Sequence, residues 1–154
     1  MSLLDIQNLQ MHFPVKGGVF MRAKATCKAV DGVSFTLEKG ETVGLVGESG
    51  CGKTTLGKAI ARLYDPTGGA VRFEGRDIPH ASQGSLRPMR RDMQMIFQDP
   101  AESLNPRHTV RDILAEPFIV QKMGTRQQRQ DWVAELLEKV GLKASHADRF
   151  PFEF

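Results

Sequence analysis

Residues 47–55 read GESGCGKTT, and the apolar run TVGLV at residues 42–46 leads directly into them. The stretch satisfies the pattern G-x-x-x-x-G-K-S/T, with an apolar segment before it and an amphipathic segment after it. Glycines let the backbone turn its N–H groups around phosphate oxygens, and the helix that begins near Lys53 adds its positive dipole end. Lys53 is a point charge for the β- and γ-phosphates, and the Thr54 hydroxyl is a ligand for Mg²⁺. The stretch therefore predicts a phosphate-binding loop.

The flanks of this loop have the periodicities that a strand–loop–helix unit requires. Residues 42–46 are apolar on both faces, which predicts a buried parallel strand. Residues 54–64 are predicted as an amphipathic helix, which the DPTGG turn at residues 65–69 stops. Residues 70–75 predict a short strand closed by a turn, and residues 93–97, MQMIF, a second core strand. The apolar residues that support the helix are Leu56, Ala59, Ile60 and Leu63.

The segment before the loop predicts a small antiparallel sheet. Apolar residues alternate over residues 4–13, but the phase shifts, which predicts a strand with a bulge near Asn8. A hairpin is predicted around residues 17–18, where two glycines are adjacent. Clean alternation over residues 33–37 then predicts a strand that ends in a turn at residues 39–40.

Two helices are predicted in the last third of the chain. The first begins after Thr109, and Pro117 is expected to end or kink it. The second begins after Thr125 in a capping-box pattern and ends at Gly141, a suitable C-terminal cap. Trp132 flanks its apolar face and is expected to pack. The residues three positions after the two caps are Asp112 and Gln128, and the apolar stripe of the second helix is Val133, Leu136, Leu137 and Val140.

Composition places the chain among ordinary soluble globular proteins. It has 154 residues, 40% hydrophobic and 25% charged, enough for one domain with a buried core. The net charge of +3 is mild and neither requires nor excludes an anionic partner, and we expect no nucleic-acid partner. Two cysteines give no disulfide framework, which favours a reducing cytosol, and the four histidines have no metal-ligand spacing. The sequence predicts neither a signal peptide nor a membrane span, so any work at a membrane is expected to go through partners.

Three stretches together resemble a known family. GESGCGKTT at 47–55, RLYDPTGG at 62–69 and MQMIFQDPAESLNPRHTVRDILAEPF at 93–118 are similar to the nucleotide-binding subunit of ABC transporters, above all to ATPases of bacterial dipeptide/oligopeptide importers. The resemblance covers essentially the whole chain. It implies an α/β P-loop NTPase fold with an N-terminal antiparallel β subdomain, a partial parallel core sheet and the start of the helical subdomain. The implied parts are residues 1–41, 42–98 and 99–154, respectively.

The resemblance also assigns the site residues, with ATP and Mg²⁺ as cofactors. Lys53 and Gln98 are implied as catalytic residues. Gln98 matches the glutamine of the Q-loop, which in the family approaches Mg²⁺ and the attacking water and whose loop senses the membrane subunit. Thr54 and Gln98 are the implied Mg²⁺ residues. The phosphate-binding positions are Gly47, Ser49, Gly50, Cys51, Gly52, Lys53, Thr54 and Thr55.

Two further expectations concern the nucleotide. The family stacks an aromatic residue of its antiparallel sheet on adenine, and Phe13 is the best match, with Phe20 as the alternative. Cys51 lies in the phosphate loop near a helix N-terminus, a placement that favours a reactive thiol. We therefore expect alkylation of Cys51 to be slowed by bound nucleotide.

Family members continue from an equivalent of RFPFEF into the signature SGGQ, followed by the Mg²⁺-associated aspartate, the catalytic glutamate and the switch histidine. This sequence stops at Phe154, one residue before the signature would begin. We therefore expect an N-terminal part of the family protein, which binds ATP but hydrolyses it near background. We also expect residues 43–46 and 93–97 to expose apolar faces and unpaired edges.

The implied partners are a second ATPase subunit, in a homo- or heterodimer, and membrane subunits contacted through the Q-loop and helical region. A substrate-binding protein acts indirectly, and the implied location is cytoplasmic, peripheral on the inner membrane. The nickel importers of the same branch are an alternative to the peptide importers. A non-catalytic nucleotide-binding module that docks on a transporter is a second alternative. A small-molecule kinase is disfavoured by the stretch FQDPAESLNPR at 97–107.

Overall fold

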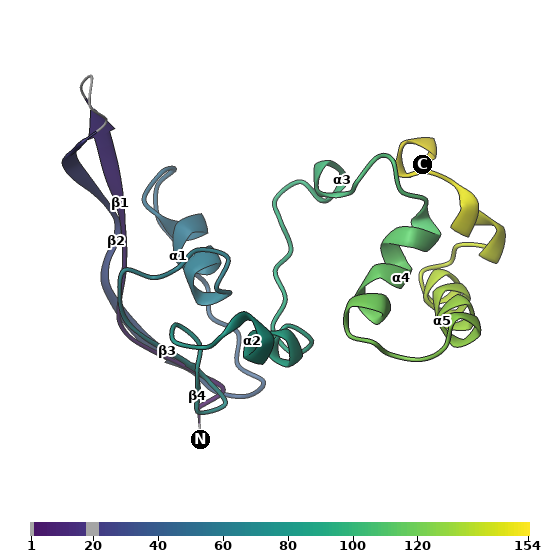
Figure 1. Cartoon of the computed structure of the whole chain (residues 1–154), viewed down its shortest axis with the longest axis horizontal. Coiled ribbons are helices and arrows are strands. Elements are labelled where there is room, and N and C mark those ends of the chain that lie inside the picture. The colour runs from purple at the N-terminus through teal and green to yellow at the C-terminus, as the bar shows by residue number, and fades with distance from the viewer. Residues whose placement is uncertain (1, 18–21) are drawn as a thin grey trace. The chain divides into compact units, whose positions relative to one another are not determined.

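A long antiparallel hairpin dominates the first part of the chain in the computed structural model, which describes residues 2–17 and 22–154 (Figure 1). Its strands are β1 (Leu4–Gly17) and β2 (Arg22–Leu37), paired from Leu4 opposite Leu37 to Gly17 opposite Arg22. The predicted hairpin around residues 17–18 therefore has its two strands in place, and residues 18–21 lie outside the described residues. The predicted strand over residues 33–37 is the end of β2.

The hairpin belongs to a four-stranded antiparallel sheet in the order β2-β1-β3-β4, with β3 (Gly68–Phe73) and β4 (Arg76–Asp77). The predicted bulge is confirmed, because the β1 register shifts between Ile6 and Leu9, and Asn8 has a φ of 48°. The bulge lets Ile6 and Leu9 both face the core, although they are three positions apart and would lie on opposite faces of a regular strand. The predicted turn before the loop is also present, with Gly40 at φ 83°.

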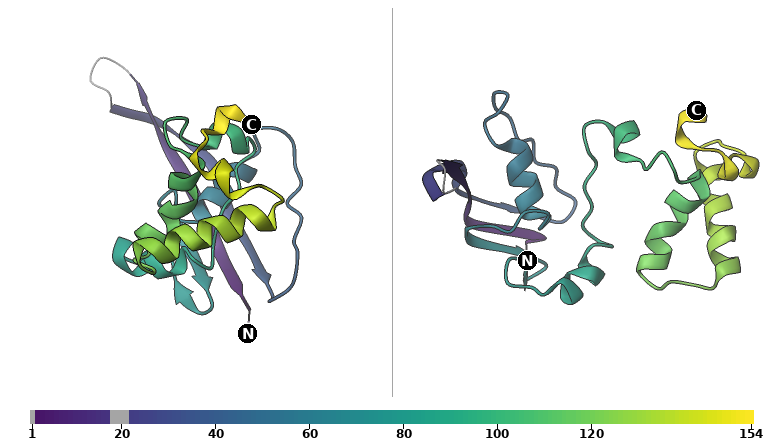
Figure 2. Two further views of the ribbon diagram at one scale, coloured as in Figure 1. Left: turned by 90° about the vertical axis from the view of Figure 1, so that its right-hand side faces the viewer. Right: turned by 45° about the horizontal axis from the view of Figure 1, so that its top comes forward.

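Contacts divide the chain into two units, Met1–Met95 and Ile96–Phe154, which we call the sheet unit and the helical unit. In the sheet unit, α1 (Lys53–Ile60) lies beside the sheet (Figures 1 and 2), and α2 (Gln83–Met89) adds buried side chains. The shared core of this unit is built from Ile6, Leu9, Met11, Val30, Leu56, Ala59, Val71, Phe73, Ile78, Leu86 and Met89.

The helix after the loop is shorter than the predicted 54–64. It ends at Ile60, after which the N–H groups of Leu63 and Tyr64 both donate to the carbonyl of Lys58 and turn the chain back. Leu63, predicted on the apolar face, is instead 43% exposed. The reason is the left-handed residue Arg62, φ 55°, which breaks the helical spacing just before the Pro-containing turn.

The two predicted core strands, residues 42–46 and 93–97, are not strands in the described chain. A strand exists only where a neighbouring strand pairs its backbone groups, and neither segment has such a neighbour among the described residues. The predicted parallel core sheet is accordingly not formed there, and the one sheet described is antiparallel. The expected exposure of their apolar side chains is confirmed, since Val46 is 93% and Ile96 90% exposed.

The helical unit contains two helices that pack side by side, α4 (Val110–Val120) and α5 (Arg126–Lys139), as Figure 1 shows. Val133, Leu137 and Ala147 form its small core. The shorter helical segments of this unit are α3 (Pro100–Ser103), η1 (Ala144–Asp148) and η2 (Pro151–Glu153).

The predicted capping box of α5 is present, and α4 has one as well. The Thr109 hydroxyl accepts the Asp112 N–H, and the Thr109 N–H donates to the Asp112 carboxylate. Thr125 and Gln128 make the same reciprocal pair. The C-terminal cap of α5 is confirmed as well, because Gly141 is left-handed, with φ 76°.

Two details of these helices differ from expectation. Pro117 does not end α4, which continues to Val120, although the ring nitrogen cannot donate to the preceding turn, and the alternative of a kink stays a prediction. The apolar stripe of α5 is narrower than predicted, since Val140 is the C-cap residue and is 70% exposed, and Leu136 is also exposed. Trp132 packs as expected, with its ring 5.0 Å from the Phe118 ring.

Candidate phosphate-binding site

The loop over residues 47–52 has a backbone that only glycine fits at two places. Gly50 and Gly52 are left-handed, with φ values of 81° and 95°. A Cβ on Gly52 would collide with the carbonyl oxygen of Ala29 on β2, so the loop also lies directly against the sheet. A Cβ on Gly47 would come within 2.7 Å of the Cys51 sulfur. Because these glycines have no side chain, the loop can pack against β2 at Gly52 and against Cys51 at Gly47.

The N-terminus of α1 is open to a ligand. Its N-cap is Gly52, which offers no side chain to accept a hydrogen bond, and its first turn contains no acidic residue. The first N–H groups of a helix have no acceptor within the helix, and together with the helix dipole they attract anions. The predicted residues Thr54 and Thr55 lie in this first turn, Thr54 exposed and Thr55 partly buried.

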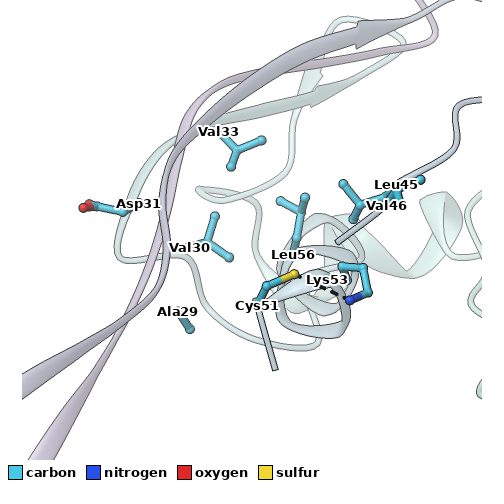
Figure 3. A pocket seen from close by; sticks show the side chains of 10 residues that line it. Ala29, Val30, Asp31, Val33, Leu45, Val46, Cys51, Lys53 and Leu56 are labelled. Carbon is cyan, nitrogen blue, oxygen red and sulfur yellow. Dashed lines mark hydrogen bonds between the residues drawn. The ribbon is translucent and has the colours of Figure 1, made fainter. Parts of the chain in front are cut away.

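Lys53 folds across the loop rather than away from it. Its Nζ donates to the carbonyl oxygens of Gly47 (2.7 Å) and Glu48 (2.5 Å) and lies 3.5 Å from the Cys51 sulfur, the contact that Figure 3 draws as a dashed line. The ammonium therefore sits among the loop residues, close to the start of α1. Ser49 lies in the exposed turn of the same loop. This combination of a glycine cradle, free helical N–H groups and one cation fits the phosphate groups of ATP.

A cavity of about 250 Å³ lies between this loop and β2. Figure 3 shows Val30, Val33 and Leu56 directed toward the same space from β2 and α1, whereas Asp31 points away from it. Leu45 and Val46 complete much of the lining. Most of the lining is apolar, but Cys51, Gly52 and Lys53 of the loop also border the cavity, so it adjoins the proposed phosphate site.

A small network of charged residues surrounds Asp31, one of the residues that border the cavity. Lys28 Nζ donates to one carboxylate oxygen of Asp31 at 3.1 Å, and His12 Nε2 lies 3.0 Å from the other. These hydrogen bonds, that from Lys28 first and that from His12 second, hold the pKa of Asp31 below its ordinary value. The network ties β1 to β2 beside the loop.

Phe13 lies in β1, partly buried, with its ring packed against Tyr64. The ring centroids are 5.7 Å apart and the rings are nearly perpendicular, at 87°. Lys58 Nζ lies 5.3 Å from the centre of the Tyr64 ring. Sequence reasoning missed Tyr64, because the residue was assigned to the end of the helix and no local pattern connects it to Phe13. Phe20, the alternative to Phe13, lies outside the described residues.

Gln98 belongs to the helical unit, where it is exposed in a bend that follows residues 93–97. It lies just before the short helix α3, whose N-terminal turn is tied by the Glu102 N–H to the Asp99 carboxylate. Its approach to Mg²⁺ and to the attacking water stays a prediction.

None of the helices in the described part of the chain combines the length and apolar character that a membrane span requires.

Comparison with known proteins identifies the family. The sequence pattern of the family described as "ABC transporter" matches residues 30–153, which is most of the chain. The dimeric ATP-binding cassette MJ0796, in a post-hydrolysis state bound to ADP and Pi, has a similar structure, with a TM-score of 0.78 and 25% sequence identity. That likeness covers 98% of this chain and 62% of the cassette.

Similar curated proteins are named for peptide transport. The oligopeptide transport ATP-binding proteins AppF and OppF of Bacillus subtilis are 50% and 51% identical, each over 99% of this chain. The dipeptide transport ATP-binding protein DppF of Escherichia coli is 42% identical over the same share. The chain spans a little under half the length of these relatives, 47%, 48% and 45% respectively.

Proposed function

The chain belongs to the ABC transporter family, and from this premise we propose that it is the ATP-binding part of an importer ATPase for dipeptides or oligopeptides. The observation that carries the ATP-binding proposal is the glycine-lined loop that closes around Lys53 at the uncapped N-terminus of α1. The names of the relatives support peptides over nickel as the transported substrate.

In this proposal the residues of the loop hold the phosphates. The backbone N–H groups at the start of α1 donate to phosphate oxygens, and the glycines keep side chains out of the space they occupy. Lys53 exchanges the loop carbonyls for phosphate oxygens, because a charge-assisted bond to an anion is stronger than one to a neutral carbonyl. Phe13 is proposed to stack on the adenine ring.

Mg²⁺ would neutralise charge on the phosphates and so favour their transfer. The Thr54 hydroxyl, on the exposed first turn of α1, and the amide of Gln98 are the proposed residues that hold it. Oxygen atoms of this kind are the ligands that Mg²⁺ prefers.

The proposed assembly is a pair of ATPase subunits on the cytoplasmic face of a membrane. The dimeric state of the cassette MJ0796 supports the pairing. The helical unit and the Q-loop around Gln98 are proposed to contact the membrane subunits of the transporter. The 154 residues contain no SGGQ sequence, so we expect this chain alone to bind ATP and to hydrolyse it near background.

The test is binding of a fluorescent ATP analogue, with Mg²⁺, to the 154-residue chain and to its Lys53→Ala variant. We expect the variant to bind at least about tenfold more weakly, a loss of about 1.4 kcal/mol or more. Lys39→Ala, which removes the same charge from an exposed turn, is the matched control and should bind normally. Equal affinity of the parent and the Lys53 variant, both with native circular dichroism, would contradict the proposal.

A further inference from the structure

We propose that Tyr64 is a positioning residue that holds the Phe13 ring as the platform for a purine base. The inference rests on the proposed ATP binding and adds a residue to it. The observation is the nearly perpendicular contact of the two rings, 5.7 Å between centroids. In such a contact Tyr64 covers either an edge or one face of Phe13, so at least one face of Phe13 stays free of it.

Tyr64 is fixed to α1, the helix whose first turn forms the phosphate site. Its backbone N–H donates to the carbonyl of Lys58 at 3.2 Å, and the N–H of Leu63 donates to the same oxygen at 2.8 Å. Above the ring, Lys58 Nζ makes a cation–π contact at 5.3 Å from the centroid. Backbone and side chain of one helical residue therefore orient the Tyr64 ring.

The chain after Tyr64 is in turn bonded to β1 next to Phe13. The Thr67 N–H donates to the carbonyl of Gln10 at 2.9 Å, and the Thr67 hydroxyl accepts the N–H of His12 at 3.0 Å. Phe13 and Tyr64 are thus held from both sides, by the sheet and by the turn. The ring of Phe13 is partly buried against the core of the sheet unit, so its tilt is set by these neighbours.

Through these contacts α1 contributes to both proposed parts of the nucleotide site, the phosphate site and the base site. In this proposal the N-terminus of α1 binds the phosphates. Lys58, near the C-terminus of α1, and Tyr64, just after the helix, set the orientation of the Phe13 ring that binds the base. An aromatic platform binds a base well only when its face is presented to the stack. We therefore assign to Tyr64 an effect on the base and none on the phosphates, which gives the proposal a specific signature.

The first experiment uses Tyr64 as its own reporter. The sequence contains one tryptophan and one tyrosine, so in a Trp132→Phe chain Tyr64 is the only strongly fluorescent side chain. We expect Mg-ATP to change the Tyr64 emission and inorganic tripolyphosphate, which has no base, to leave it unchanged. In the same background Phe13→Leu should abolish the response to ATP. An unchanged Tyr64 emission at saturating ATP would overturn the proposal.

The second experiment compares affinities by calorimetry for Mg-ATP and for inorganic tripolyphosphate. Tyr64→Leu should bind ATP about tenfold more weakly, the scale of losing one aromatic stack, and bind tripolyphosphate as the parent does. Tyr64→Phe keeps the perpendicular ring and should restore the ATP affinity. Equal ATP affinity in Tyr64→Leu and the parent, or equal losses for both ligands, would overturn the positioning role. A parent chain that binds neither ligand would instead refute the proposed ATP binding, and the role of Tyr64 with it.

Discussion

The N-termini of α4 and α5 are closed by their own side chains, whereas the N-terminus of α1 is open. Thr109 and Thr125 accept an N–H from the first turn of α4 and α5, respectively, and a polar residue three positions later returns the bond. At α1 a left-handed glycine, Gly52, takes the cap position, and no side chain there accepts an N–H.

The difference separates two helices that are capped by their own residues from one helix that we propose binds an anion. A capping box satisfies part of the free N–H groups internally, so a capped helix gains less from an external anion. Helix α1 leaves those groups without a side-chain acceptor and places the Lys53 cation beside them. A bound anion would therefore supply the missing hydrogen-bond acceptor. The stability of the sheet unit should therefore respond to nucleotide, while that of the helical unit should respond to its caps.

The largest effect should follow from adding a methyl group at Gly52, the N-cap residue of α1. In Gly52→Ala the new Cβ meets the Ala29 carbonyl oxygen, and the residue must keep a φ of 95°. We expect a loss of roughly 2–4 kcal/mol in stability and of nucleotide binding. Urea unfolding and binding of a fluorescent ATP analogue measure the two losses.

Gly40→Ala is the matched control for that substitution. Gly40 has a similar φ of 83°, but a Cβ there would meet no atom within 4 Å. It should cost only the backbone strain, about 1 kcal/mol, and leave binding intact. Equal behaviour of the two variants would show that the contact between the loop and β2 is unimportant.

A second prediction probes the same loop without changing the sequence. The Cys51 thiol is exposed and lies 3.5 Å from Lys53 Nζ, within the loop that is proposed to hold the phosphates. We expect Mg-ATP to slow alkylation of Cys51 several-fold, because bound phosphates cover the loop. Cys27, the other exposed thiol, lies opposite Phe13 in the β1–β2 pair, so the measurement uses a Cys27→Ser chain in which Cys51 alone reacts. Identical Cys51 rates in both conditions would refute the expectation.

A third prediction concerns the N-terminal cap of α5. Thr125→Ala removes the hydroxyl that accepts the Gln128 N–H at the start of α5. We expect the helical unit to lose about 1 kcal/mol of stability, the usual value of such a cap, and ATP binding to stay unchanged. The emission of Trp132 on α5 follows unfolding of this unit directly. Thr125→Ser, which keeps the hydroxyl, should be close to the parent.

The smallest effect concerns pH. Hydrogen bonds from the hydroxyl and the N–H of Thr109 hold the pKa of Asp112 below its ordinary value of 3.8. Because the folded pKa is the lower one, the stabilisation is complete above pH 3.8 and is lost as the pH falls through the folded pKa. Asp112→Asn should therefore be less stable than the parent at pH 7 and show a weaker loss below pH 4.

The control for this titration is Thr109→Ser, which keeps the hydroxyl that donates to the Asp112 carboxylate. It should unfold with the pH dependence of the parent. An equal shift of the acid transition in the two variants would show that the Asp112 carboxylate does not cause this pH dependence of stability.

Features that depend on a few neighbouring residues were predictable from the sequence. The left-handed glycines of the loop, the capping box of α5, the bulge at Asn8 and the glycine cap at Gly141 follow from residue types at short spacing. Their hydrogen bonds and φ angles involve residues at most a few positions apart. The end of α1 was predicted less well, since Arg62 in a left-handed conformation has no sequence signal that separates it from a helical arginine.

Features that need a distant partner were not predictable in the same way. Residues 42–46 and 93–97 have the composition of core strands, yet neither is a strand here, because pairing is a property of two segments. The ring contact of Phe13 with Tyr64 joins residues that no periodicity connects. The collision that makes glycine necessary at position 52 is with Ala29 of another element.

The sequence by itself determined the family of this protein and its glycine-rich loop with Lys53, which we propose to bind phosphate, because close spacing fixes which groups can reach one ligand. The tertiary structure decided what surrounds that loop. It placed the Ala29 carbonyl under Gly52, turned the Tyr64 ring perpendicular to Phe13 and left α1 without a cap of its own. These outcomes required the fold because each depends on the position of one chain segment against another, which short-range preferences do not specify.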